Sequence, residues 1–114
     1  MKPFEIFIAY ISWGGGGKSR PVLVYSQGGD DVSIHCITSR YDSKSEVVKA
    51  NYFRIVDWQY SGLDRPSYID TGTRFELPKS IFDGKNPVGR LSDADIDGLL
   101  DFLGKDMGKG RSRP

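Results

Sequence analysis

Apolar residues recur along the chain in short runs that polar turn residues separate. The run 4–13 is rich in Phe, Ile, Tyr and Trp at consecutive positions, which predicts a central strand. Residues 22–25, opened by Pro21, and residues 32–38, with alternating apolar and polar side chains, predict two more strands. Shorter strands are expected at 52–58, 68–69 and 75–77. This pattern predicts a strand-rich barrel or sandwich.

The segments between these runs have the composition of connections. Residues 14–17 are four consecutive glycines and predict a mobile link, and residues 40–51 predict a long polar surface loop. At the other end of the chain, residues 105–114 hold four cations, one acid and one sizeable apolar side chain. We therefore expect a single domain over 1–104, followed by a basic disordered tail.

A helical period occurs only late in the chain. Ser92, with Asp95 three residues on, has the pattern of a helix N-terminal cap. Ile96, Leu99, Leu100 and Leu103 then recur at helical spacing. One helix with an apolar stripe is therefore expected to pack on the barrel, and Gly104 is expected to end it.

Length and composition restrict the class of protein. A chain of 114 residues is one domain, and a net charge of +1 gives no overall sign of a nucleic-acid partner. Cys36 is the single cysteine, which excludes an internal disulfide and a four-cysteine zinc site. His35 is the single histidine, which excludes a pair of imidazoles acting as acid and base. No apolar run approaches the roughly 18 residues of a membrane span. We expect a cytoplasmic protein with no membrane partner.

Two motifs suggest ligands that their contexts do not support. Residues 14–19, GGGGKS, resemble a phosphate loop, but Ser12 stands where that motif needs glycine and Pro21 follows where it needs a helix. Residues 93–98 open like a calcium loop, but the twelfth position is Gly104 instead of a bidentate glutamate. Neither a metal nor any other cofactor is expected.

Polar residues at strand ends are the candidates for chemistry. They are Arg20 before the second strand, Thr38, Ser39 and Arg40 at the end of the third, and Asp70 with Arg74 after a later one. Each also fits a role without chemistry, because exposed arginines are usually solvated and Thr, Ser and Asp often form turns. His35 is expected to face outward from its strand.

Four segments in order resemble the MazF/PemK toxins. KSRPVLVYS (18–26) is similar to their loop and second strand, where Arg-Pro precedes apolar β residues. ITSR (37–40) resembles the end of their third strand, and SYIDTGTRFELPKSIF (67–82) their strand pair with its short turn. GRLSDADIDGLLDFL (89–103) resembles their closing strand and C-terminal helix. The resemblance spans most of the chain.

This resemblance implies a fold and a function. The fold would be mainly β (α+β), an SH3-like small barrel of the MazF/CcdB type with one C-terminal helix. The protein would be a homodimeric toxin of a type II toxin–antitoxin system, inhibited by a cognate antitoxin protein. Its activity would be metal-independent cleavage of single-stranded RNA. Attack by a ribose 2′-OH would leave a 2′,3′-cyclic phosphate and a 5′-OH.

The resemblance also implies roles for individual residues. Arg20 would be the catalytic arginine, Thr38 the catalytic hydroxyl, and Asp70 an aspartate that assists in some members. RNA-binding side chains would be Lys18, Ser19, Ser39, Arg40 and Arg74. A guanidinium suits the charge that develops on phosphoryl oxygens, but arginine is a poor base. The base is therefore left open between Asp70 and His35.

Two other functions fit a similar fold. A CcdB-like toxin would bind DNA gyrase without catalysis, but such toxins act through an apolar chain end, and this chain ends in GKGRSRP. An SH3-like module could bind RNA or protein with an idle site. Cleavage of RNA in the presence of EDTA would distinguish the metal-independent ribonuclease from both of these alternatives.

Overall fold

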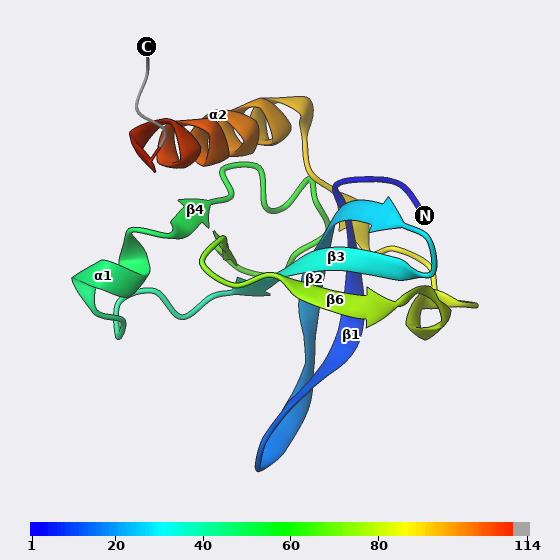
Figure 1. Ribbon diagram of the computed structural model, residues 1–114. Helices are drawn as coiled ribbons and strands as arrows, with labels where there is room; N and C mark the ends of the chain where they lie inside the picture. The colour runs from blue at the N-terminus through cyan, green and yellow to red at the C-terminus, as the bar shows by residue number, and fades with distance from the viewer. Residues whose placement is uncertain (111–114) are drawn as a thin grey trace.

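A computed structural model describes residues 1–110 of the chain (Figure 1). The strands are β1 (Glu5–Trp13), β2 (Gly16–Gly28), β3 (Asp31–Thr38), β4 (Tyr52–Arg54), β5 (Tyr68–Asp70), β6 (Phe75–Pro78) and β7 (Gly89–Arg90). The helices are α1 (Glu46–Lys49), the 3-10 helix η1 (Lys79–Phe82) and α2 (Asp93–Gly110). No helix in this part of the chain is long and apolar enough to span a membrane.

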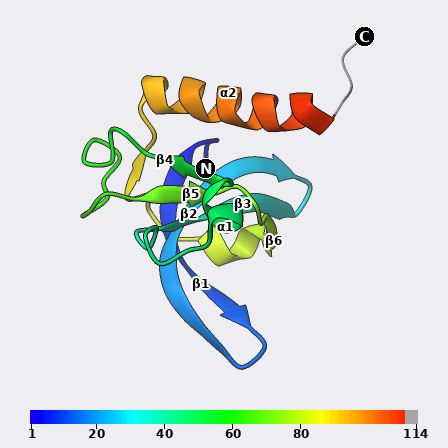
Figure 2. The ribbon, with the colours of Figure 1, turned by 90° about the vertical axis from the view of Figure 1, so that its left-hand side faces the viewer.

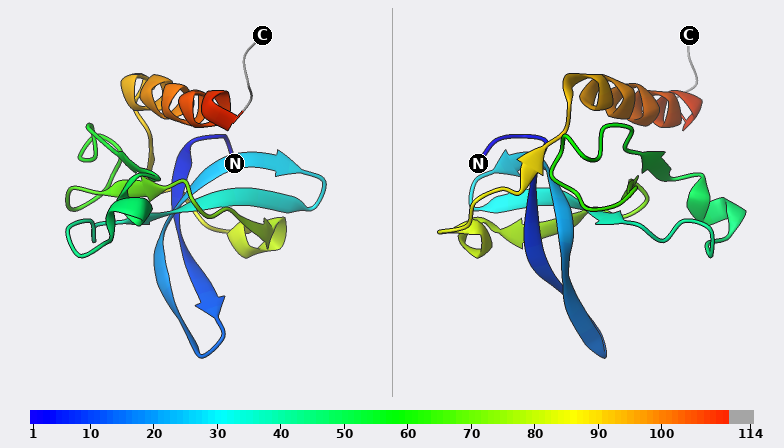
Figure 3. Two further views of the ribbon diagram at one scale, coloured as in Figure 1. Left: turned by 60° about the vertical axis from the view of Figure 1, so that its left-hand side comes forward. Right: turned by 180° about the vertical axis from the view of Figure 1, so that it is seen from behind.

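The strands form one curled antiparallel sheet in the order β4-β5-β3-β2-β1-β7, and β6 pairs with β3. Figures 1 and 2 show α2 at one end of the molecule and the tip of the β1–β2 hairpin at the other. The two further views in Figure 3 show the same arrangement. The predicted class, a small and mainly β barrel with one C-terminal helix, is confirmed.

The β1–β2 hairpin includes residues that the sequence assigned to a flexible link. Gly16 and Gly17 pair with the end of β1, so the turn is tight and Gly15 adopts a φ of 111°. Pro21 lies within β2 instead of opening it. The proline is tolerated there because pairing of β2 with β3 begins only at Val22, so no hydrogen bond to β3 is lost.

Alternate residues of the strands enter two cores, one on each face of the sheet. The first core consists of Phe7, Ala9, Ile11, Val22, Val24, Val32, Ile34, Cys36 and Phe82. The second consists of Ile6, Leu23, Ile37, Ile55, Ile69, Leu91, Ile96 and Leu99. Because β3 contributes to both, its two faces are buried. Full burial of each Ile or Leu stabilises the fold by about 1.5–3 kcal/mol.

Helix α2 begins where the sequence predicts and ends later. The Ser92 hydroxyl oxygen accepts a hydrogen bond of 3.1 Å from the Asp95 N–H, as expected of a cap. Leu100, predicted to lie on the packed stripe, is 45% exposed. The predicted end at Gly104 is wrong, since that residue does not adopt the positive φ of a terminating glycine and the helix continues to Gly110. The remainder of the predicted tail, 111–114, lies outside the described residues.

The strand expected over 52–58 and the loop expected over 40–51 both differ in detail from their predictions. The strand expected over 52–58 ends at Arg54. The Ile55 N–H still bonds to the Ser67 carbonyl, but those of Val56 and Asp57 bond to the Asp95 carboxylate instead of to a strand. The loop expected over 40–51 contains the short helix α1. Ser45 caps this helix by accepting a hydrogen bond of 3.3 Å from the Val48 N–H.

Candidate functional site

A cleft of about 400 Å³ opens between strands β1, β2 and β3 and the β4–β5 loop, residues 55–67. Its apolar lining consists of Ile8, Pro21, Ile37, Leu63 and Val88. Its polar lining consists of Lys18, Ser19, Arg20, Thr38, Ser39, Arg40, Asp64, Arg65 and Ser67. Six of the eight side chains singled out in the sequence therefore come together here. Four cations face one carboxylate, so the cleft suits an anion.

The cleft exists because strands β2 and β3 part at this end of the sheet. Their pairing stops at Val22 and Cys36, and residues 18–20 of β2 pair only with β1. The last two residues of β3, Ile37 and Thr38, pair with β5 instead. Polar side chains at the two strand ends are thus exposed to the same space while the strands themselves stay fixed.

Arg20 also belongs to a polar cluster beside the cleft, which we call the Arg20 cluster: Arg20, Cys36, Tyr52 and Asp70. Tyr52 and Asp70 are directly opposite each other on β4 and β5. Arg20 and Asp70 both act electrostatically on the Cys36 thiol and on the Tyr52 hydroxyl, which places the four groups together. Among the described side chains, the Arg20 Nε–H is a buried donor without a hydrogen-bond partner. Such a group costs about 1–3 kcal/mol, and a catalytic or ligand-binding role is one explanation for it.

Two groups of the Arg20 cluster keep their protons at neutral pH. Burial raises the pKa of the Cys36 thiol above its ordinary value, and Arg20 only partly opposes the rise. Burial and the Asp70 carboxylate likewise raise the pKa of Tyr52. Cys36 is therefore not the thiolate that nucleophilic catalysis needs, and Tyr52 is a hydrogen-bond donor.

Thr38 and Asp70 are held in different ways. The Thr38 Oγ1 accepts a hydrogen bond of 3.1 Å from the Arg40 N–H, which leaves its own O–H to donate into the cleft. An Asp70 carboxylate oxygen accepts one of 2.9 Å from the Gly72 N–H, and Asp70 is absent from the cleft lining. Asp70 therefore influences the cleft indirectly, through its electrostatic effect on the Arg20 cluster.

Two other sequence candidates lie away from the cleft. Arg74 is outside its lining and pairs with Glu76 at 3.5 Å. His35 was expected to face outward, but it is buried, because β3 is covered on both faces. Its Nδ1–H donates to the Thr73 carbonyl at 3.0 Å, and its ring packs edge-on against Tyr25. This histidine has a packing role and does not reach the cleft.

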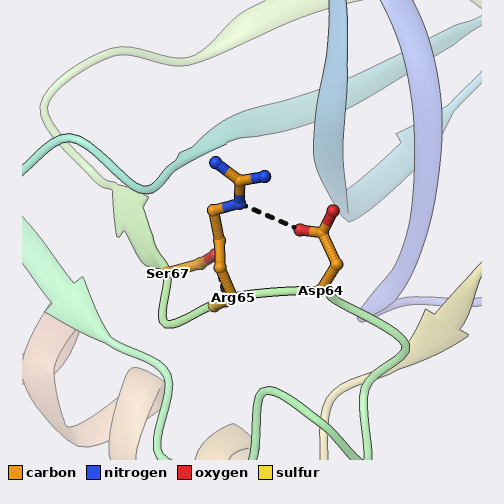
Figure 4. Close-up of polar contacts among 3 residues, drawn as sticks. All are labelled: Asp64, Arg65 and Ser67. Atoms are coloured by element: carbon orange, nitrogen blue, oxygen red, sulfur yellow. Dashed lines mark hydrogen bonds and ion pairs between the residues drawn. The ribbon is translucent and has the colours of Figure 1, made fainter.

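Sequence reasoning missed the third wall of the cleft, formed by Asp64, Arg65 and Ser67. Figure 4 shows Asp64 and Arg65 pointing the same way from the β4–β5 loop, joined at 3.2 Å. The Ser67 hydroxyl donates to the Arg65 carbonyl at 2.8 Å. The sequence near this wall offers only Gly62 as a signal; its φ of +89° and its close approach to the Val88 carbonyl appear in the structure alone.

Comparison with known proteins connects this arrangement to a known fold. No family model and no curated protein sequence matches the chain. Among solved structures, it is similar to the Mycobacterium tuberculosis toxin MazF-mt6, with a TM-score of 0.67 and 21% identity. The match covers 91% of this chain and 96% of that toxin. The chain has a MazF-like fold. The resemblance found in the sequence is thereby confirmed for the fold.

Within this MazF-like fold, the cleft offers hydroxyls and cations as its chemistry. Among the side chains that the structure describes, no three His, Cys, Asp or Glu residues group closely enough to hold a metal ion. The hydrogen-bond donors that line the cleft are guanidinium, ammonium and hydroxyl groups, which bind phosphate oxygens.

Proposed function

We propose that this protein is the toxin of a type II toxin–antitoxin pair and cleaves single-stranded RNA without a metal ion. The observation that carries the proposal is Arg20, a half-buried arginine that lines the cleft with Thr38 and keeps a buried Nε–H unpartnered. A cation kept only for packing would have its donors paired. A phosphate group in the cleft would give this Nε–H the acceptor that it lacks among the described side chains.

The proposed reaction is an internal transesterification. The ribose 2′-oxygen bonds to phosphorus, the bond from phosphorus to the 5′-oxygen breaks, and a 2′,3′-cyclic phosphate and a 5′-OH result. Negative charge grows on the phosphoryl oxygens, where two guanidinium N–H groups of Arg20 and the Thr38 O–H donate. Because arginine is a poor base, the role of Arg20 is to stabilise charge. Because Asp70 lies outside the cleft lining, its carboxylate is our candidate to accept the 2′-OH proton through one bridging water, and the leaving 5′-oxygen takes a proton from water.

The same proposal assigns binding roles and partners. Lys18, Ser19, Ser39 and Arg40 line the cleft around Arg20 and Thr38 and would bind the RNA backbone. We propose that the protein acts as a homodimer in the cytoplasm. A cognate antitoxin would inhibit by occupying the cleft.

Cleavage in the presence of a chelator tests the proposal. The protein is incubated with a long single-stranded RNA in excess EDTA, and the ends of the products are identified. We expect fragments with a 2′,3′-cyclic phosphate and a 5′-OH, and none from Arg20→Ala. Activity that vanished in EDTA and returned with Mg²⁺ or Mn²⁺ would show that the mechanism is wrong. Intact RNA in every sample would show that the protein is not an RNA-cleaving enzyme and would favour a binding protein.

A further inference from the structure

The β4–β5 loop brings a third guanidinium to the cleft, from the wall opposite strand β2. Arg65 lines the cleft together with Lys18, Arg20 and Arg40. Its side chain is 65% exposed, so a ligand can reach it without moving the core. Its one ion-pair partner within the described residues is the adjacent Asp64, at 3.2 Å and 84% exposed. None of the sequence patterns above points to either residue.

The Asp64–Arg65 pair is weak and open to exchange. An exposed ion pair contributes only about 0–1 kcal/mol, because water screens it. A phosphate offers the guanidinium a second anionic partner in the same position, with more acceptor oxygens than one carboxylate contact uses. Asp64 is also the single acid in the cleft lining, so it opposes the entry of any anion.

The backbone that carries Arg65 is fixed at several points, unlike its side chain. The buried Ser67 donates to the Arg65 carbonyl at 2.8 Å, and the Ser67 carbonyl accepts from the Ile55 N–H at 3.0 Å. Gly62 packs directly on the backbone of Val88. A fixed backbone under an exposed, charged side chain lowers the entropy that binding must overcome.

We propose that Arg65 binds a backbone phosphate of the RNA strand in the cleft and that Asp64 is its internal competitor. The strand is then held from two sides, by Lys18 and Arg40 next to Arg20 and by Arg65 across from them. Arg65 is a binding residue in this scheme and takes no part in bond breaking. The inference rests on the proposed function, because it names a subsite of the same cleft.

Equilibrium binding of an RNA that cannot be cut tests Arg65 separately from catalysis. The probe is a single-stranded 2′-O-methyl RNA, titrated with wild type, Arg65→Ala, Asp64→Asn and Arg90→Ala at several salt concentrations. Arg90→Ala is the matched control, since the Arg90 side chain is 48% exposed and pairs with the Asp93 carboxylate but lies outside the cleft lining. Thermal unfolding of each variant checks that the fold is intact.

The variants should move the affinity in opposite directions. Arg65→Ala should weaken binding about tenfold, as for one charge-assisted contact. It should lower the slope of log K against log salt by about 0.7, the value for one phosphate contact to a single strand. Asp64→Asn should tighten binding, and Arg90→Ala should leave it unchanged. With cleavable RNA, Arg65→Ala should raise KM and leave kcat unchanged.

Other results would overturn the inference. Equal affinities for Arg65→Ala and Arg90→Ala would remove Arg65 from the site, and weaker binding by Asp64→Asn would remove Asp64 as a competitor. If wild type binds the probe but never cuts RNA, the proposed function fails while the Arg65 effect still supports this subsite. If wild type does not bind the probe at all, both fail.

Discussion

The carboxylate of Asp95 in the first turn of α2 accepts a hydrogen bond of 2.8 Å from the backbone N–H of Asp57. Its other oxygen accepts one of 3.0 Å from the Val56 N–H. Ser92, which caps the same helix, donates from its hydroxyl to the Asp57 carboxylate at 2.7 Å. The start of α2 thus fixes the start of the β4–β5 loop, which carries Arg65 to the cleft.

Replacing Asp95 should therefore destabilise the protein strongly. In Asp95→Ala two backbone N–H groups lose the buried carboxylate that accepts from them, at a cost of about 1–3 kcal/mol each. Each kcal/mol corresponds to a fall of about 4–8 °C in Tm for a domain of this size. Thermal unfolding followed by circular dichroism measures the change.

Asp97→Ala is the control for this prediction. Asp97 lies on the same helix but is exposed, and an exposed substitution changes stability by less than about 0.5 kcal/mol. Equal melting temperatures for Asp95→Ala and Asp97→Ala would show that the hydrogen bonds from Val56 and Asp57 do not support the loop.

The sequence predicted the strand framework well because local patterns control it. Strands β1 and β3 have dense apolar runs, and the start of α2 has a recognisable cap at Ser92. Asp95 was predicted as part of that cap, yet its side chain turns to a loop 38 residues earlier. No local pattern encodes such a contact, so the sequence also overestimated the length of the strand that begins at Tyr52.

The same distinction explains the candidate site. Arg20 and Thr38 were predicted because they flank apolar strands, whose ends could be read locally. Arg65 was missed because its place in the cleft depends on the approach of Gly62 to Val88, a contact between distant segments. His35 was misjudged for a related reason. An outward-facing His35 would require one face of β3 to be exposed to solvent. Both faces of that strand are instead covered by the two cores.

Substitutions of Arg20 should separate charge from geometry. Arg20→Ala should lose cleavage by a factor that corresponds to about 3–4 kcal/mol of barrier, the typical cost of one donor to a developing oxyanion. Arg20→Lys should recover little, because an ammonium group cannot make the planar two-bond contact. Single-turnover cleavage of one defined RNA measures the rates, and unchanged Tm values exclude loss of the fold. Wild-type rates in Arg20→Ala would remove Arg20 from the site.

Cys36 should resist alkylation in the native protein. Burial raises the pKa of its thiol, so at pH 8 the native state holds less thiolate than an unfolded chain does. Iodoacetamide should therefore react slowly with native protein and quickly in denaturant, as mass spectrometry would record. The raised pKa also stabilises the fold at low pH, and this contribution is lost as pH rises through the native value. Native labelling as fast as denatured labelling would contradict the burial of Cys36.

The β1–β2 hairpin should carry the contact between two copies of the chain. It projects from the barrel, and two side chains on one of its faces, Ile8 and Tyr10, are 43% and 59% exposed (Figures 1 and 2). Apolar surface of this kind is usually covered by a partner, and a two-fold axis lets the same patch serve both copies. Sedimentation at micromolar concentration should give about twice the 12.7 kDa mass of one chain.

A charge on this hairpin should separate the two copies. In Tyr10→Glu a carboxylate would enter the shared interface, and we expect the monomer mass with little change in Tm, because Tyr10 lies outside both cores. Val47→Glu is the matched control, since Val47 is also exposed and apolar but lies on α1, away from the hairpin. It should remain dimeric. A monomeric wild type would contradict the assembly itself, and a dimeric Tyr10→Glu would move the contact to another face of the barrel.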